Sequence, residues 1–374
     1  MSRSSRRERR ERPRRVPRRP DWLSLEERVV PVVSEVWNPT MELARWGFDL
    51  GRAMAPELQS LVMPARQAEG APVAGMPRSA MLHDDQGRVG VRISGGNVEA
   101  VAPALPALGG WVSGMRADLF VLEGFVPVDQ LLTLETIVAD HGNGMTGVAR
   151  PEVATGSILS QADSLMEADR ARLGVPGGLT ETGVTVGVLS DSYNIRGGEA
   201  AGIASGNLPA DVNVVLEGPA GGSDEGRAMI ELVHDLAPGA GKAFASAFYG
   251  ELAFGNAIRD LADPAIGNAH VISDDVFYFE EPLYQDGVIA QAIDEVTANR
   301  DVAYFSLAGN LGRNAWETAN ASFNVDSVYN DGPNYLDFNT SAGVDSRQRI
   351  TLQPNQTFRI TLQWDQPFYN PSEV

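Results

Sequence analysis

Three segments of this sequence place a polar side chain where a strand would end or a helix would begin. They are GVTVGVLSDS at 183–192, DEGRAM at 224–229 and VAYFSLAGN at 302–310. Their polar residues at these positions are Asp191, Glu225 and Asn310. Carboxylates can act as general acids or bases, and an amide N–H can stabilise a developing oxyanion. Because ligand chemistry in open α/β sheets gathers at the carboxyl ends of strands, the three side chains are candidates for one site.

Each segment also has a structural interpretation that involves no chemistry. An Asp at a strand end can cap the next loop, acidic residues are favoured at a helix N-terminus, and an Asn can stabilise a turn. Taken in this order, however, the segments resemble the subtilisin-like serine peptidase superfamily over about residues 183–312. That resemblance implies Asp191 and Glu225 as acid and base residues, Asn310 as oxyanion donor, and a polypeptide as the substrate.

Two further segments extend the resemblance, and one position departs from it. APGA at 237–240 ends the expected Glu225 helix, and DGVIAQAI at 286–293 is similar to a helix in a bacterial branch of the superfamily. Typical members open the first of these helices with His, whereas the sedolisin branch has Glu with an Asp four residues on, where this chain has Met229. We therefore expect a mixed form in which Asp191 is a like-charged neighbour that raises the pKa of Glu225, an arrangement suited to acidic conditions.

The nucleophile of the superfamily has no counterpart among these residues. Subtilases carry it in a Gly-Thr-Ser motif on a late helix, and the sequence contains no such motif. Ser341, in NTSAG at 339–343, lacks the preceding Gly and the following Pro-His. His234 cannot replace the missing His, because nine residues at about 100° each put it on the helix face opposite Glu225. We expect a chain truncated before the catalytic serine and without peptidase activity of its own.

The pattern of apolar runs predicts the elements that position these residues. Between about 183 and 333, runs of strand length alternate with helical segments, which is typical of a parallel sheet with helices on both faces. Strands are expected at 184–189, 212–216, 242–248, 270–273 and 302–306, and helices near 225–236, 252–261 and 288–298. The expected fold class is therefore α/β, as a partial subtilisin-like domain.

Other segments flank this α/β domain. The expected divisions are a basic disordered tail at 1–40, a helix and linker at 41–78, an α+β domain at 79–151, a connector at 152–182, the α/β domain at 183–333 and the first strands of a β-sandwich at 334–374. The α+β domain follows from strands at 89–93 and 119–125 and helices near 98–108 and 128–139. It lies where subtilases carry a propeptide, and TLQWDQPF at 361–368 resembles a β-sandwich inserted in some bacterial members.

Composition narrows the possible partners and cofactors. The 374 residues carry a net charge of −19, and because residues 1–20 hold ten Arg and two Glu, the remainder carries −27. The strong negative charge of the residues after position 20 argues against a nucleic-acid-binding fold. The absence of Cys excludes disulfides and Cys-ligated metals, and no run approaches the roughly 18 apolar residues of a membrane span. No Asp-rich loop has a defined calcium-ligand pattern, so we expect no metal and no cofactor.

Two other functions are alternatives to a peptidase. The scaffold could belong to a non-catalytic surface or binding protein, and a Gly-Thr-Ser helix encoded downstream would distinguish the two. A nucleotide-binding Rossmann sheet is disfavoured, because no glycine fingerprint opens a helix after the strand at 184–189. The resemblance points to an extracellular or cell-surface location without a clear signal peptide, and nothing in the sequence specifies an oligomeric state.

Overall fold

The computed structural model describes residues 53–62, 81–153, 162–174 and 179–310, with short stretches at 312, 315–318, 322–325, 334–339, 343–346 and 360–364. The chain divides into a unit of 39–319 with 349–374 and a unit of 1–38 with 320–348. In the second unit, the described strands β12 (Phe323–Val325) and β13 (Asn334–Leu336) pair antiparallel. The expected basic tail lies outside the described residues, and in the expected β-sandwich segment residues 360–364 have no regular secondary structure.

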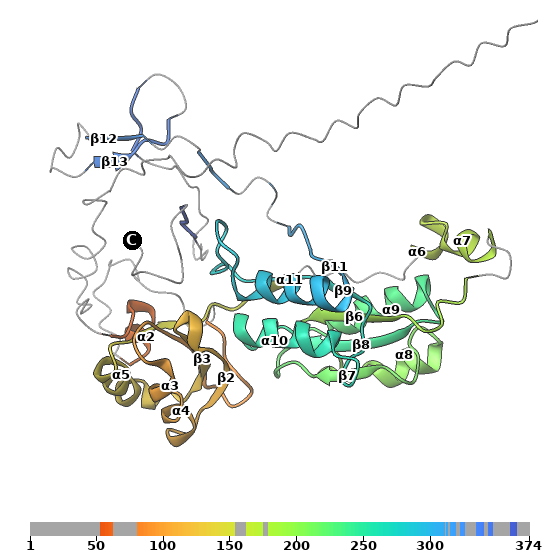
Figure 1. Cartoon of the computed structure of the whole chain (residues 1–374), viewed down its shortest axis with the longest axis horizontal. Helices are drawn as coiled ribbons and strands as arrows, with labels where there is room; N and C mark the ends of the chain where they lie inside the picture. Colours follow the sequence, from red (N-terminus) through yellow and green to blue (C-terminus); the bar gives the residue numbers. More distant parts are fainter. Residues whose placement is uncertain are drawn as a thin grey trace, which may run out of the picture. The chain divides into compact units, whose positions relative to one another are not determined.

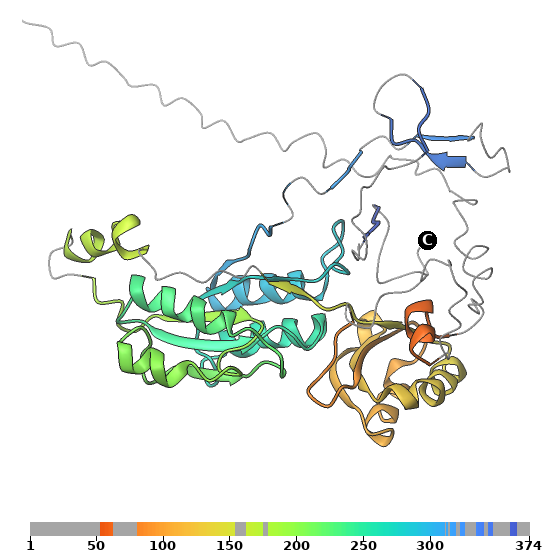
Figure 2. The same ribbon diagram turned by 180° about the vertical axis from the view of Figure 1, so that it is seen from behind.

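A parallel sheet with helices packed beside it forms the α/β part of the larger unit (Figure 1, Figure 2). In the described part, its five strands follow the order β11-β9-β6-β8-β7, and every neighbouring pair is parallel. The strands are β6 (Thr185–Ser190), β7 (Asn213–Leu216), β8 (Gly241–Ser246), β9 (Val271–Asp274) and β11 (Ala303–Phe305). Each overlaps one of the five predicted strands, so the prediction of an α/β fold with a parallel sheet is confirmed.

Helices cover both faces of this sheet. They are α8 (Glu199–Ser205), α9 (Glu225–Leu236), α10 (Glu251–Ala262) and α11 (Val288–Arg300). On one face, Ile230 of α9 packs against Val188 and Phe244. On the other face, α10 and α11 share a core with Leu189 and Ala245. Because successive strand residues point to opposite faces, Val188 and Leu189 belong to separate cores, and the predicted coverage of both faces is confirmed.

The helix α9, which connects β7 to β8, covers an unexpected face of the sheet. The connections from β7 to β8, from β8 to β9 and from β9 to β11 all step across the sheet in one direction. Right-handed crossovers, which account for about 98% of such connections, would place α9, α10 and α11 on the same face. Since α9 lies opposite the other two, at least one of the three is left-handed. The start of α9 meets the end of β6, where Gly226 N–H donates to the Ser192 carbonyl at 3.0 Å.

A small α+β domain precedes the sheet. Its antiparallel sheet has the order β2-β3-β1-β4, formed by β1 (Val89–Ser94), β2 (Trp111–Arg116), β3 (Val121–Val126) and β4 (Gly144–Gly147). Its helices are α3 (Val98–Val101), α4 (Ala104–Ala107) and α5 (Leu131–Asp140), and α2 (Pro56–Val62) is the described part of the expected segment at 41–78. Pro103 separates α3 from α4 where one helix was expected, because it lacks the backbone N–H that would continue the helix.

The α+β domain packs on α10 through aromatic and small residues. Trp111 stacks on Phe125 with 4.8 Å between ring centroids, and it meets Tyr249 edge-on at 5.6 Å. Gly114 comes so close to α10 that a Cβ there would lie 2.4 Å from the Cβ of Leu252. Phe125 and Leu252 belong to the same hydrophobic core as the sheet, so this core is continuous between the two domains.

A short strand that follows the α+β domain pairs with the α/β domain. β5 (Glu152–Val153) runs antiparallel to β10 (Val276–Phe277), with Val153 opposite Val276 and Glu152 opposite Phe277. In the described part of the connector, α6 (Ala162–Leu165) and α7 (Ala168–Gly174) follow. β5 is therefore an extended segment of the chain laid along a strand that continues from the end of β9.

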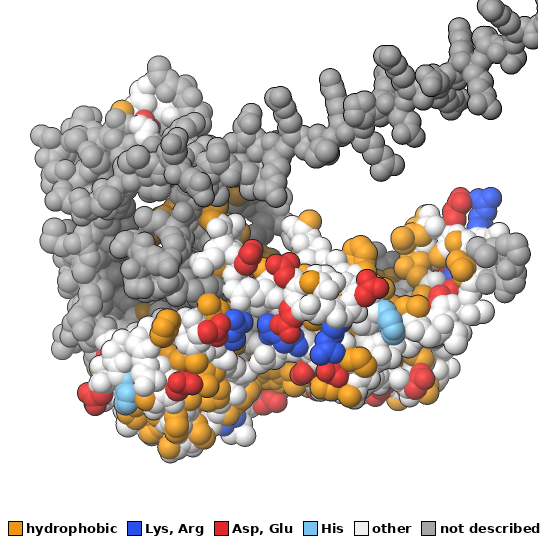
Figure 3. All heavy atoms as spheres, viewed as in Figure 1, with side chains coloured by type: hydrophobic (Ala, Val, Ile, Leu, Met, Phe, Trp, Pro, Cys, Tyr) orange, Lys and Arg blue, Asp and Glu red, His pale blue; other side chains and the backbone are white. Residues whose placement is uncertain are grey.

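Charges of both signs are interspersed on the face formed by α10 and α11 (Figure 3). Arg259 pairs with Glu295 at 2.7 Å, and Arg300 pairs with Asp263 at 3.2 Å. The described residues of this face therefore form no continuous basic strip of the kind that binds nucleic acid. No helix in the described ranges is both long enough and apolar enough to cross a membrane.

Candidate active site

Asp191 lies one residue beyond β6 and is almost fully buried, at 3% exposure. Its Oδ2 accepts hydrogen bonds from the backbone N–H and, at 2.6 Å, from the hydroxyl of Ser223. Its Oδ1 accepts from the Ser192 hydroxyl at 3.1 Å and from the backbone N–H of Glu225 at 3.2 Å. Both oxygens are thus occupied by groups that hold the loop leading into α9.

Glu225 is the first residue of α9, as expected, and the structure brings it beside Asp191 through that backbone bond. The preceding residue, Asp224, has a left-handed backbone with φ of 62°. Its carboxylate accepts from the Arg196 backbone N–H at 3.0 Å and pairs with Arg227 at 2.6 Å. These bonds stabilise a conformation that is unfavourable for a non-glycine residue, and they orient the start of α9.

Two carboxylates that the sequence motifs did not reveal lie at the end of the neighbouring strand. Asp274 ends β9 opposite Leu189 of β6, and Asp275 donates its backbone N–H to the Leu189 carbonyl at 3.3 Å. They are only 4% and 8% exposed. A signal was present in the sequence, since both follow directly after the predicted apolar strand at 270–273, and buried carboxylates at such a position are uncommon.

Burial and neighbouring charge act together on Asp275. Neither carboxylate oxygen of Asp275 is hydrogen-bonded to a described residue. Burial is the main reason that its pKa is raised, to about 7, and the nearby Ser190 hydroxyl offsets only part of that rise. The charges of Glu225, Asp191 and, to a smaller extent, Asp274 raise the pKa further. Asp275 can therefore hold a proton near neutral pH.

Asp274 instead binds β11, the strand on the other side of β9. Its oxygens accept from the Tyr304 hydroxyl at 2.6 Å and from the Ser306 hydroxyl at 2.9 Å. Burial raises the pKa of Asp274, and these two hydrogen bonds limit the rise. The hydroxyl of Ser306 is thus bonded at the end of β11 to a carboxylate that belongs to β9. Ser341, the other serine considered from the sequence, lies outside the described residues.

Asn310 follows β11 in an exposed turn. The preceding Gly309 has φ of 73°, which favours glycine, and a Cβ added there would lie 3.9 Å from a ring carbon of Phe277. The turn therefore passes beside β10. The oxyanion role of Asn310 stays a prediction.

His234 is remote from Glu225 in the structure. It lies in the last turn of α9, nine residues from Glu225, which corresponds to about 13 Å along a helix axis. Burial lowers the pKa of His234, and the charge of Lys242 adds to that effect. His234 therefore does not act as the base at the start of this helix, as its helical position indicated.

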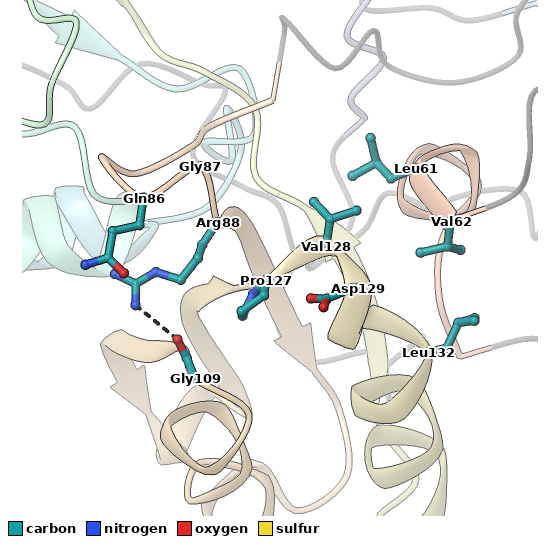
Figure 4. A pocket seen from close by; sticks show the side chains of 10 residues that line it. All are labelled: Leu61, Val62, Gln86, Gly87, Arg88, Gly109, Pro127, Val128, Asp129 and Leu132. Atoms are coloured by element: carbon teal, nitrogen blue, oxygen red, sulfur yellow. Dashed lines mark hydrogen bonds between the residues drawn. The ribbon is translucent and has the colours of Figure 1, made fainter.

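A pocket lies in the α+β domain and is not lined by these carboxylates (Figure 4). It measures about 740 Å³ and lies beside a hydrogen bond of 3.0 Å from Arg88 to the Gly109 carbonyl. Apolar side chains such as Leu61 and Leu132 line it together with Asp129. No group of three or more His, Cys, Asp or Glu within the described ranges has a geometry that could hold a metal ion.

Replacing Asp191 with Asn tests whether this carboxylate anchors the loop. Asp191→Asn is expected to lower the free energy of unfolding by about 1–3 kcal/mol, because an amide has one oxygen where the carboxylate uses two as acceptors. Urea unfolding at pH 8 measures the loss. Asp294→Asn, at an exposed position of α11, is the matched control. Equal stability of the two variants would contradict the anchoring role.

Comparison with known proteins gives similarity at the level of solved structures. No protein family and no curated protein matches the chain. It is similar to fervidolysin from Fervidobacterium pennivorans, a keratinolytic enzyme related to subtilisin, with 13% identity and a TM-score of 0.35 over 62% of this chain and 42% of that one. It is also similar to the epidermin leader peptide processing serine protease EpiP of Staphylococcus aureus, with 10% identity and a TM-score of 0.33 over 60% of each chain. This chain thus spans less than two thirds of either protease.

Proposed function

We propose that this chain carries the substrate-binding strand and the acid and base residues of a subtilisin-like serine endopeptidase. The observation that carries the proposal is the antiparallel pairing of β5 with β10. Addition of an extended peptide to an exposed strand is a general mode of peptide recognition. β10 begins at Val276, directly after Asp275, so a polypeptide bound along it would pass the carboxylates at the ends of β6 and β9.

The proposed chemistry is acyl transfer to a serine hydroxyl. Glu225 accepts the hydroxyl proton as general base and returns it to the leaving amine, and Asn310 donates an N–H to the oxyanion. The serine belongs to a Gly-Thr-Ser segment that is not among these 374 residues. The substrate is a polypeptide in an extended conformation, and we place the protein outside the cell or at its surface.

The purified 374-residue chain is expected to cleave no denatured protein and to take up no fluorophosphonate label between pH 4 and 8. The reason is that acyl transfer needs an activated nucleophile, and Ser306 already donates to Asp274. A longer polypeptide from the same gene, with a Gly-Thr-Ser helix, is expected to cleave and to lose about 10²–10⁴-fold of its activity in Glu225→Gln. Asp294→Asn is the control and should keep full activity.

Two results would contradict the proposal. Labelling of Ser341 in the 374-residue chain, abolished by Glu225→Ala, would show that the nucleophile is present after all. Peptide binding without cleavage or labelling by the longer polypeptide would favour a non-catalytic binding protein on the same scaffold.

A further inference from the structure

Two carboxylates that interact with Glu225, Asp191 and Asp275, differ in what surrounds them. Asp191 accepts four hydrogen bonds, two of them from Ser223 and one from the backbone of Glu225 itself. Asp275 is more than nine-tenths buried, and neither of its oxygens has a well-formed hydrogen bond, although the nearby Ser190 hydroxyl offsets part of the effect of burial. A buried carboxylate with so little hydrogen bonding is costly, so a neighbour that can share a proton with it would lower that cost.

The alternation of strand residues places Asp275 on the side of the sheet where α9 lies. Ile272 of β9 packs in the core with α10 and α11, so residues at odd distance from it face the other side. Asp275 is three residues beyond Ile272. By the same alternation Ser190 shares the face of Val188, which packs with α9. The side chain of Asp275 is thus directed to the face covered by α9, which begins with Glu225.

We propose that Asp275, rather than Asp191, is the carboxylate that shares a proton with Glu225, while Asp191 anchors the backbone from which Glu225 projects. The inference rests on the proposed peptidase function, in which Glu225 is the base. It assigns to Asp275 a positioning and proton-holding role that acts through Glu225. It also revises the expectation from sequence, which paired Glu225 with Asp191.

The charges around Asp275 also support its assignment as the partner of Glu225. Asp275 faces charge from α9 through Glu225, from the end of β6 through Asp191 and from its own strand through Asp274. Asp191 and Asp274 already accept hydrogen bonds from the hydroxyl groups of Ser223 and Tyr304. Asp275 is therefore the carboxyl available to share a proton with Glu225, as in carboxylate dyads.

The protonation state of Asp275 and Glu225 then changes in a defined order during the reaction. At rest it holds one proton, on Asp275, and Glu225 is ionised. When the serine hydroxyl attacks, its proton moves to Glu225, and the pair holds two protons and no charge. The proton on Glu225 passes to the leaving amine, which restores the resting state.

Carboxyl titration by NMR tests the pair in the 374-residue chain, with ¹³C-labelled aspartate and glutamate side chains. The Asp275 signal is assigned by its loss in Asp275→Asn, and the Glu225 signal by its loss in Glu225→Gln. The titration midpoint of Asp275 is expected to fall by about one pH unit, a tenfold change in proton affinity, in Glu225→Gln, because Asp275 then ionises without a charged neighbour. The midpoint of Glu225 is expected to stay within a few tenths of a pH unit in Asp275→Asn, because Glu225 ionises while Asp275 is still protonated and neutral.

Asp294→Asn is the control and should move neither signal. If Asp275 keeps its midpoint in Glu225→Gln, or if Asp294→Asn shifts it equally, the pair does not exist. Those results would leave the peptidase proposal intact, since cleavage by the longer polypeptide is measured separately. Conversely, coupled titration in a protein that proves inactive would support the pair and overturn only the peptidase proposal.

Discussion

Raising the pH from 5 to 8 is expected to lower the free energy of unfolding of this chain, by about 3 kcal/mol from Asp275 alone. Burial, with the nearby charges of Glu225 and Asp191, raises the pKa of Asp275 to about 7. Burial also raises the pKa of Glu281 to about 7, with the charge of Glu251 adding to it, and raises the pKa of Glu251 itself. Three carboxyls therefore act in the same direction.

The sign follows from proton binding in the two states. In the unfolded chain these groups ionise near pH 4, whereas in the folded chain they keep their protons to about pH 7. Between those values the folded state binds more protons, so the free energy of unfolding falls as the pH rises and levels off above about 7. Asp84 acts oppositely at low pH: burial favours its neutral form, but hydrogen bonds from Trp111 and Arg88 outweigh burial and lower its pKa. Stability is therefore expected to be highest near pH 4–5.

Urea unfolding from pH 4 to 8 measures this profile, and Asp275→Asn isolates the largest contribution. That variant is expected to be more stable than the natural chain at pH 8 and nearly equal to it at pH 4, because Asn removes a buried charge that exists only at the higher pH. Asp294→Asn should follow the natural chain throughout. A natural chain whose stability is constant or rises from pH 5 to 8, or a pH-independent effect of Asp275→Asn, would refute this account.

The sheet could be predicted from the sequence because its strands are nearly continuous apolar runs. Thr185–Ser190 and Gly241–Ser246 are central and covered by helices on both faces, so most of their buried positions are apolar, with Ser190, Lys242 and Ser246 as polar exceptions. The predicted strands also gave the positions of the strand ends, and therefore the positions of Asp191 at the end of β6 and Glu225 at the start of α9. Both predictions rest on local patterns that the fold preserves.

The site around Asp275 could not be predicted in the same way, because its properties depend on contacts between distant segments. Whether Asp191 or Asp275 has free oxygens depends on Ser223 and Ser192, which bond only one of them. β10 is only two residues long, too short for any periodicity, and its existence depends on pairing with Glu152–Val153. Neither feature has a signature in the residues next to it.

Arg92 joins the α+β domain to α10 through two buried ion pairs. From β1 it bonds Glu123 at 2.6 Å and Glu251, the first residue of α10, at 2.9 Å. Glu123 also accepts the Leu252 backbone N–H at 2.9 Å, which caps α10. The close approach requires glycine at Gly250, with φ of 102°, because a Cβ would lie 2.5 Å from a Glu123 oxygen. One guanidinium thus compensates two buried carboxylates between the domains.

Arg92→Met is therefore expected to lower the free energy of unfolding by about 3–5 kcal/mol at pH 8, because it leaves Glu123 and Glu251 buried without their cation. The loss should be smaller at pH 5, where the raised pKa of Glu251 lets it bind a proton. Arg170→Met, which breaks an exposed pair with Glu167, should cost at most about 1 kcal/mol. After limited proteolysis within the connector at 152–182, the two fragments should co-elute in gel filtration for the natural chain and separate for Arg92→Met. Equal losses in the two Met variants, or fragments of the natural chain that part without denaturant, would show that this ion cluster does not hold the domains together.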